Sequence, residues 1–236
     1  MTCLHGFSQH GDSWAELASA VAGPYRWLTP DLHATSPEGV LADVLGLWDA
    51  EGVARSHVVG YSQGGRLALR LAVEHPERLL TLTTIGAHAG LEGEERAARL
   101  VEDEALARRI ELEGIDWFAG YWAARPLFAG LAGRGPEFLR RLDAGRRRND
   151  PLHLAAALRG LGQGATLPLW DRLPSLRAPS LVVAGEQDGR YVELGRRLAR
   201  ALPHGRLAVV PGAGHAVHLE RPEAVAELLA AHLSRR

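Results

Sequence analysis

Short apolar runs alternate with amphipathic stretches along most of the chain. The apolar runs predict strands over residues 2–5, 25–28, 56–60, 79–85, 180–184 and 207–210. Apolar positions at helical spacing predict helices over residues 13–22, 37–51, 63–74, 191–201 and 222–233. Strands that alternate with helices are typical of a mostly parallel sheet covered by helices. We therefore predict an α/β fold with a sheet of about six strands.

The segment 88–173 breaks this alternation. It is rich in Ala, Leu, Arg and Glu and poor in β-branched residues, which predicts several consecutive helices. Ordinary crossover helices are one interpretation, but a crossover needs only about a dozen residues. We predict instead a helical cap, inserted before the last two strands and lying over the carboxyl edge of the sheet, where ligands bind. Residues 1–87 and 174–236 then form the core.

Composition narrows the classes of function. The 236 residues carry a formal net charge of −1, so no overall field attracts nucleic acid or an anionic membrane. No apolar run approaches the ~18–20 residues of a membrane span, and the first residues lack a signal-peptide pattern. Cys3 is the only cysteine, which excludes an intrachain disulfide and a cysteine-based metal site. We expect a cytoplasmic enzyme; the oligomeric state stays open.

All 27 basic residues are arginine, and Asn149 is the only asparagine. Codon bias and heat tolerance would each account for this composition. In either case no lysine is present to form a Schiff base, which excludes aldolase and pyridoxal chemistry that depends on one.

A candidate nucleophile lies between a predicted strand and a predicted helix. Residues 60–65 read G-Y-S-Q-G-G, which contains the G-x-S-x-G pattern centred on Ser62. The turn is so tight that side chains at Gly60 and Gly64 would collide, and it projects the Ser62 hydroxyl outward. The following helix directs its first amides toward the reacting atom. Alone the pattern is weak, but the strand before it and the helix after it strengthen the assignment.

A serine hydroxyl needs a base, and the base needs an acid to orient it. Asp188 and His215 follow the strands predicted at 180–184 and 207–210, in the order serine, acid, histidine along the chain. Asp188 alone could be a turn residue and His215 a surface histidine. Three matches in the right order, each after a strand, favour a catalytic triad.

An oxyanion hole is expected from two backbone amides. One is the N–H of Gln63, the residue after the nucleophile, and the other is that of Phe7 in the loop after the first strand. We interpret His5 as a histidine that stabilises this loop rather than as a catalytic group. The histidines show no zinc-binding spacing and no accompanying acidic cluster, so we predict no metal and no cofactor.

These motifs resemble those of the α/β-hydrolase superfamily over nearly the whole chain. They identify a superfamily, whose members include esterases, C–C hydrolases, haloperoxidases and lyases, rather than one reaction. A narrower resemblance is to the 2-succinyl-6-hydroxy-2,4-cyclohexadiene-1-carboxylate synthases of menaquinone biosynthesis. It rests on Y-S-Q-G-G-R at 61–66, G-L at 90–91 with E-R-A-A-R at 95–99, Y-W at 121–122 with P-L-F at 126–128, and R-R-R-N at 146–149.

This resemblance implies elimination of pyruvate from an enolpyruvyl cyclohexene substrate, with the triad abstracting a proton rather than forming an acyl-enzyme. It also implies a substrate pocket lined by Tyr61, Arg66, Arg99, Trp122 and Arg146. The chain departs from the family pattern at three places: the usual strands before the first loop are missing, Ala89 replaces a common proline, and Arg190 replaces a common lysine. These departures leave room for a related esterase.

The charge pattern supports a small anionic substrate independently. Between residues 121 and 172 there are nine arginines and four acids, and guanidinium groups bind carboxylates through paired hydrogen bonds. Solvated helix faces account for most of these arginines. Arg66 differs, because a cation in the first turn opposes the helix dipole, and we expect it to point into the pocket.

Two other hypotheses remain. A carboxylesterase would hydrolyse short acyl esters through an acyl-serine intermediate. A non-catalytic binding protein on the same fold would tolerate loss of a triad member, so the intact set argues against it.

Overall fold

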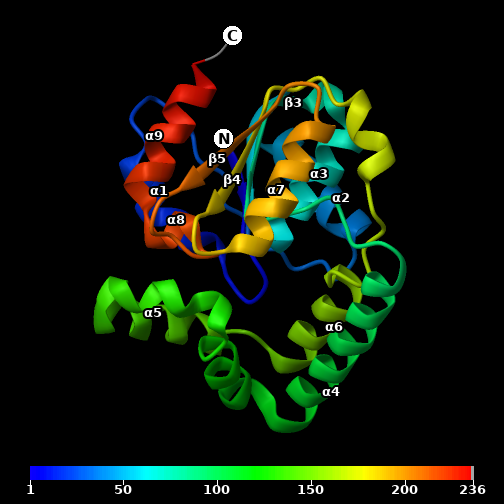
Figure 1. The fold of residues 1–236 in the computed structure, drawn as a ribbon, viewed down its shortest axis with the longest axis vertical. Coiled ribbons are helices and arrows are strands. Elements are labelled where there is room, and N and C mark those ends of the chain that lie inside the picture. Colours follow the sequence, from blue (N-terminus) through cyan, green and yellow to red (C-terminus); the bar gives the residue numbers. More distant parts are fainter. Residues whose placement is uncertain (235–236) are drawn as a thin grey trace.

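The computed structural model describes residues 1–234 (Figure 1). Within this range one sheet forms, with strands β1 (Thr2–Leu4), β2 (Ser56–Tyr61), β3 (Leu79–Ile85), β4 (Ser180–Gly185) and β5 (Gly205–Val210). All the strand pairs are parallel, and the spatial order follows the chain order. The predicted α/β fold is confirmed.

The sheet has one strand fewer than the sequence suggests, because the segment 25–28 forms no strand among the described residues. Only Leu28 pairs with the sheet: its N–H donates to the Met1 carbonyl at 2.8 Å, and its carbonyl accepts from Cys3 at 2.9 Å. Pro24 and Pro30 flank the segment and lack the N–H that a longer ladder needs. A single bridge is the result.

Helices cover both faces of the sheet (Figure 1). One face carries α2 (Pro37–Ala50), α3 (Gln63–Glu74) and α7 (Gly189–Ala201), and the other α1 (Ala15–Ala20), α8 (Val217–Glu220) and α9 (Pro222–Leu233). Short 3₁₀ turns η1 (Gly11–Trp14) and η2 (Pro76–Arg78) precede α1 and β3. Because both faces are covered, β2, β3 and β4 are almost entirely buried.

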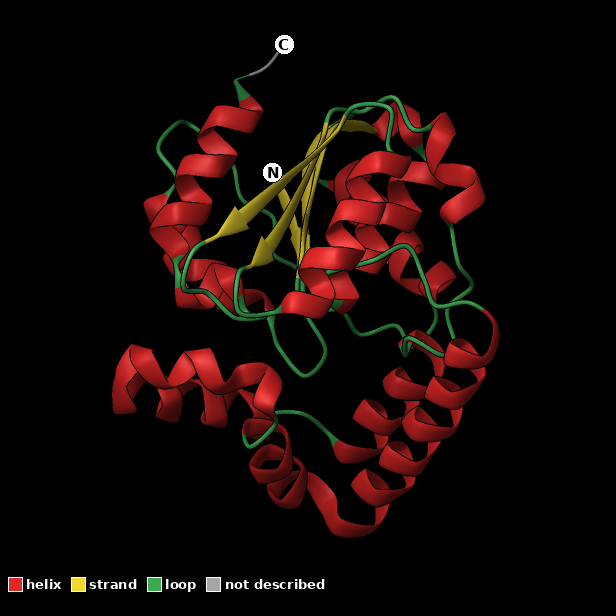
Figure 2. Ribbon diagram, viewed as in Figure 1, coloured by secondary structure: helices red, strands yellow, loops and turns green. Residues whose placement is uncertain are grey.

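The chain between β3 and β4 is helical. It forms α4 (Gly93–Ala123), η3 (Pro126–Arg134), α5 (Gly135–Arg147), α6 (Pro151–Leu161) and η4 (Trp170–Ser175). Helices α4, α5 and α6 lie beyond the arrowheads of the strands, at the carboxyl edge of the sheet (Figure 2). The exact limits of a cap at residues 88 and 173 stay a prediction.

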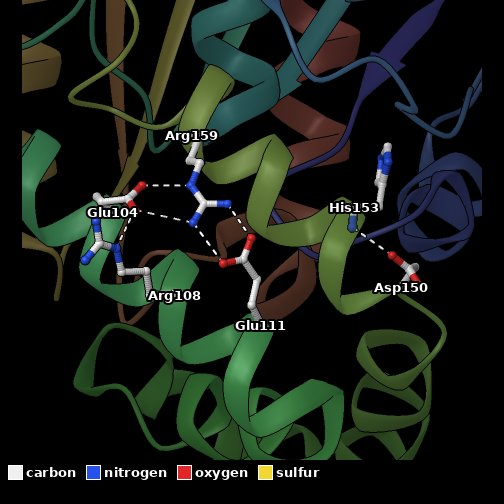
Figure 3. A network of polar contacts seen from close by, with 6 residues as sticks. All are labelled: Glu104, Arg108, Glu111, Asp150, His153 and Arg159. Atoms are coloured by element: carbon white, nitrogen blue, oxygen red, sulfur yellow. Dashed lines mark hydrogen bonds and ion pairs between the residues drawn. The ribbon is translucent and has the colours of Figure 1, made fainter.

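Helices α4 and α6 pack along their length. A small apolar cluster that includes Ile110, Phe118 and Leu158 lies between them. On the outside, Arg159 of α6 bonds to both Glu104 and Glu111 of α4 (Figure 3). Helix α4 is broken at Gly114, whose φ of 78° and ψ of −176° turn the chain within the helix.

No helix in the described part of the chain combines the length and the apolar character needed to cross a membrane.

Candidate active site

Ser62 lies in a strained turn between β2 and α3. Its φ is 50° and its ψ −109°, a conformation that non-glycine residues rarely adopt. A Cβ on Gly60 would lie 2.3 Å from the Gly64 carbonyl oxygen, so the tight turn requires glycine there. A Cβ on Gly64 would lie 2.0 Å from the carbonyl oxygen of Leu4. The sequence predicted a collision between side chains at 60 and 64. The structure shows instead that the end of β1 requires glycine at 64.

The structure brings Ser62, Asp188 and His215 together. His215 Nε2 lies 3.2 Å from Ser62 Oγ, and His215 Nδ1 lies 2.7 Å from Asp188 Oδ2. The His215 side chain is 1% exposed and that of Asp188 9%. With the Nδ1 proton directed at the carboxylate, the lone pair on Nε2 is free to accept the serine proton. This arrangement is suited to general-base chemistry.

Helix α7 orients the acid. Asp188 is the N-cap residue of α7, and its Oδ1 accepts from the Tyr191 N–H at 3.4 Å while Oδ2 faces the imidazole. The Tyr191 ring lies 4.5 Å from the His215 ring and is buried against it. Sequence reasoning missed Tyr191 as a site residue, although its position three residues after Asp188 places it one helical turn away on the same face.

The loop that carries His215 is held by a buried carboxylate. Glu220 is 3% exposed, and it accepts hydrogen bonds from the Gly214 and Ala216 N–H groups at 2.6 Å and 3.1 Å. These amides flank His215, so Glu220 fixes the backbone on both sides of the imidazole. Sequence reasoning did not identify Glu220, because nothing in its spacing indicates that it turns back onto the loop.

Two residues that line a cavity together with Ser62 have backbone amides without an acceptor in the described part of the chain. Within residues 1–234 neither the Phe7 nor the Gln63 N–H has an acceptor, and Gln63 opens helix α3, where the helix dipole is positive. His5 lies in the same loop as Phe7, and both of its ring nitrogens are hydrogen-bonded to backbone groups. Its Nδ1 donates to the Gly6 carbonyl at 2.9 Å and its Nε2 accepts from the Leu32 N–H at 3.0 Å. Burial lowers the pKa of His5 to about 4, so it is neutral at pH 7.

This cavity of about 690 Å³ is lined by Phe7 and Gln63, by residues at the carboxyl edge of the sheet and by residues of α4, α5 and α6. Ser62 and His215 line it, as do all five residues that the resemblance implied for the substrate pocket: Tyr61, Arg66, Arg99, Trp122 and Arg146. The part of the chain that is described holds no cluster of three His, Cys, Asp or Glu side chains suited to a metal ion.

Two guanidinium groups in the cavity wall are buried and lack a carboxylate within ion-pair distance in residues 1–234. Arg66 is 8% exposed; its Nη2 donates to the Leu161 carbonyl at 2.5 Å, and its Nε has no partner. Burial lowers the pKa of Arg66 to about 10, which leaves it positive at neutral pH. Arg146 is 7% exposed and lies over the Phe128 ring at 5.7 Å. Arg99 differs, because it is paired with Asp103 at 2.6 Å.

Aromatic rings line part of the same cavity, and one of them, Phe128, lies under Arg146. The Trp122 ring stacks on Phe118 at 5.4 Å and meets the edge of Phe7 at the same centroid distance. Phe128 continues this aromatic lining at 5.7 Å from Trp122. Tyr61 extends it toward His215, and burial raises the pKa of the Tyr61 phenol well above its ordinary value. The cavity thus combines an apolar surface with fixed positive charge.

Most of the other arginines between residues 121 and 172 are neutralised from outside that segment. Ion pairs join Arg134 and Arg141 to Glu16, Arg148 to Asp12, Arg159 to Glu104 and Glu111, Arg172 to Glu74, and Arg147 to Asp116 as well as Asp143. The local excess of positive charge in the sequence therefore overstates the charge of the cavity. Of the nine arginines between residues 121 and 172, only Arg125 and Arg146 line the cavity.

Comparison with known proteins places the chain in a family. The alpha/beta hydrolase family profile matches residues 3–228. A 2-succinyl-6-hydroxy-2,4-cyclohexadiene-1-carboxylate synthase of Salmonella schwarzengrund (strain CVM19633) is 32% identical over 237 residues, which cover 96% of this chain and 90% of that protein. The synthase of the same name from Klebsiella pneumoniae is 30% identical over 236 residues, with the same coverage.

Solved structures share the fold. The structure of MenH from S. aureus matches with a TM-score of 0.93 at 24% identity, and covers 98% of this chain and 92% of that one. A thermophilic esterase from Thermogutta terrifontis, with malate bound, matches with a TM-score of 0.85 at 23% identity over 98% of this chain and 87% of that one. Because the profile matches residues 3–228 and the relatives align over 96% of the sequence, this chain belongs to the alpha/beta hydrolase family.

Proposed function

We propose that this chain eliminates pyruvate from an enolpyruvyl cyclohexene carboxylate to form 2-succinyl-6-hydroxy-2,4-cyclohexadiene-1-carboxylate. The names of its relatives support this reaction. The observation that carries it is the hydrogen-bonded chain from Ser62 through His215 to Asp188, which opens on a cavity with the unpaired guanidinium groups of Arg66 and Arg146. A substrate with several carboxylates needs cations of this kind, since each can bind two oxygens.

The proposed steps use only groups of this chain. His215 takes the Ser62 proton, and the serine oxygen removes a proton from a ring carbon. The C–H electron pair forms a new ring double bond as the C–O bond to the enolpyruvyl group breaks. The imidazolium, stabilised by Asp188, then gives its proton to the methylene carbon of the departing enolate, which leaves as pyruvate. The Phe7 and Gln63 amides stabilise negative charge on oxygen during the transfer.

The helical segment 88–173 has the role of a cap in this proposal. Arg99, Trp122 and Arg146 would hold the substrate from the cap, and Tyr61 and Arg66 would hold it from the core. The substrate is a small anionic molecule, no cofactor enters the scheme, and the reaction is assigned to the cytoplasm. The single cysteine, Cys3, is free and buried, as suits a reducing compartment.

The test is to measure pyruvate release from the enolpyruvyl substrate beside hydrolysis of a panel of short p-nitrophenyl esters. Ser62→Ala should lose at least ~10³-fold in the rate of pyruvate release, because it removes the proton acceptor. Ser19→Ala is the matched control, since Ser19 bonds only to its own helix at Ala15 and should leave the rate unchanged. A Ser62→Ala enzyme with nearly full activity would exclude Ser62 from the mechanism.

A carboxylesterase remains the second candidate. The free Phe7 and Gln63 amides beside a triad serine would equally stabilise the tetrahedral intermediate of ester hydrolysis. The two reactions are distinguished by the covalent state of Ser62. An acetyl group on Ser62 after mixing with p-nitrophenyl acetate, detected by mass spectrometry and without pyruvate release from the enolpyruvyl substrate, would favour the esterase.

A further inference from the structure

We propose that Gln163 binds a carboxylate oxygen of the substrate, and that His88 fixes the Gln163 amide so that it presents only N–H groups to the cavity. The inference rests on the proposed function, because it assigns part of the same site. Neither residue belongs to the triad or to the motifs from which the sequence resemblance was drawn.

The direction of the hydrogen bonds follows from one backbone amide. The Gly90 N–H can only donate, and it lies 3.0 Å from His88 Nδ1. His88 Nδ1 must therefore be the unprotonated nitrogen, and the ring proton must be on Nε2. His88 Nε2 lies 3.0 Å from Gln163 Oε1, so it donates to that oxygen. The Gln163 amide is thereby held in one of its two orientations.

The other end of the Gln163 amide is free. Gln163 lines the cavity, and its side-chain nitrogen has no hydrogen-bond acceptor within residues 1–234. The side-chain nitrogen offers two N–H donors to the cavity, while the amide oxygen is directed at His88. An ammonium group, which can only donate, would find no acceptor in this amide, whereas a carboxylate or carbonyl oxygen would accept from its N–H groups.

Arg66 adds a positive charge close by. Its Nη2 donates to the carbonyl of Leu161, two residues before Gln163, and it lines the same cavity. Arg66 also opposes protonation of His88: burial and this guanidinium lower the pKa of His88 to about 4. His88 therefore stays neutral at pH 7 and keeps Nδ1 as an acceptor. A charge-assisted donor beside a fixed amide favours a carboxylate over a neutral carbonyl.

The first test compares two substrates in variants of Gln163. Gln163→Leu should raise the KM of the enolpyruvyl substrate about 10-fold with little change in kcat, as expected when a binding contact is lost. Gln163→Glu should lower kcat/KM at least ~100-fold, because it places a carboxylate oxygen beside Arg66 where the substrate carboxylate would bind. For p-nitrophenyl acetate, which lacks a carboxylate, the rise in KM and the fall in kcat/KM should each be at least several-fold smaller. Equal losses for the two substrates would overturn the proposal.

The second test addresses His88. If His88 acts only by orienting Gln163, then His88→Leu should raise KM by about the same factor as Gln163→Leu, and the double variant should be no worse than either single one. Multiplicative effects of the two substitutions would contradict this coupling. Circular dichroism and thermal melting of each variant check that the fold is retained.

A binding measurement separates this proposal from the proposed function. Titration calorimetry with succinate as a carboxylate probe requires no turnover. If the wild-type enzyme releases no pyruvate but binds succinate, and Gln163→Leu weakens that binding, then the proposed reaction fails and the carboxylate site stands. If the wild type releases pyruvate and Gln163→Leu changes neither KM nor succinate affinity, then the reaction stands and the assignment of Gln163 fails. If the wild type neither releases pyruvate nor binds succinate, then both the proposed reaction and the carboxylate site fail.

Discussion

Arginine occupies two different environments in this protein. On the surface, Arg108 and Arg109 pair with acids one helical turn away, as many others do, and such exposed pairs contribute little to stability. Inside the cavity, Arg66 and Arg146 are buried and have no acid within ion-pair distance in the described chain. A buried cation without a counter-ion is costly unless another partner compensates it. The enolpyruvyl substrate, with its carboxylates, is the compensating partner in our proposal.

Arg146 gives a direct test of this argument at the scale of one residue. Arg146→Gln removes the charge, and it leaves no acid unpaired because no carboxylate in residues 1–234 lies within ion-pair distance of Arg146. We expect kcat/KM for the enolpyruvyl substrate to fall by the equivalent of about 2–3 kcal/mol, roughly 30–150-fold. Steady-state kinetics with p-nitrophenyl acetate provide the comparison, and an equal fall with that neutral ester would show that Arg146 supports the fold rather than the anion.

The sequence allowed the triad residues to be located but not the residues around them. Ser62, Asp188 and His215 each follow a strand, and parallel strands end at one edge of the sheet, so their order along the chain implied that they would meet. Glu220 escaped notice because its hydrogen bonds run back to the Gly214 and Ala216 amides through a turn. The ion pair of Arg134 with Glu16 joins residues far apart in the sequence, which composition cannot reveal.

At the scale of elements, the shape of the cap depends on the break in α4. Gly114 has φ 78° and ψ −176°, a region that is almost restricted to glycine. A Cβ there would meet no atom from another part of the described chain within 4 Å, so the obstacle to a side chain is the local backbone conformation. The break lets α4 pack on α6 and still carry Trp122 to the cavity.

Gly114→Ala should therefore destabilise the protein or straighten the helix. We expect a loss of about 1–3 kcal/mol in the free energy of unfolding, measured by urea denaturation, together with a lower kcat/KM as Trp122 moves. Gly120→Ala is the matched control, because Gly120 lies in the same helix, has no atom within 4 Å of the added Cβ and has no positive φ. It should stabilise by roughly 0.5–1 kcal/mol. The same effect from both substitutions would refute a special role for the break.

The positions of the elements were predictable where an apolar pattern coincided with a clear boundary. Helix α2 begins at Pro37 after the Ser36 cap, as the sequence indicates. The segment 25–28 has the apolar pattern of a strand, yet the flanking prolines limit it to one bridge with β1. The packing of α4 on α6 depends on which apolar faces meet in space, and the sequence alone does not determine that pairing.

At the scale of the whole molecule, buried histidines link stability to pH. Burial lowers the pKa of His5 and His88 to about 4 and that of His218 to about 3, all below the ordinary value of 6.5. The unfolded chain binds protons at these sites below about pH 6.5, and the folded chain does not. Their contribution to stability is therefore complete above pH 6.5 and is lost as the pH falls toward 4.

His218 allows this link to be measured. It packs between Trp14 and Tyr61, and neither ring nitrogen has a hydrogen-bond partner in residues 1–234, so His218→Phe breaks no hydrogen bond. Between pH 6 and pH 4.5 the variant should lose less stability than the wild type, by about 1.4 kcal/mol per pH unit at the steepest. Urea unfolding at several pH values measures the difference. Parallel pH curves would show that His218 does not titrate differently on unfolding.

Strands β3 and β4 are hydrogen-bonded neighbours, with Ile85 beside Val183, although helices α4 to α6 separate them along the chain. The polypeptide thus departs from the sheet and rejoins it at adjacent positions. A longer or shorter segment inserted between these two points would leave the pairing of β3 with β4 unchanged. The residues that contact a ligand from helices α4 to α6 can therefore change within one continuous stretch of sequence, while the strands and the triad residues at their ends stay the same.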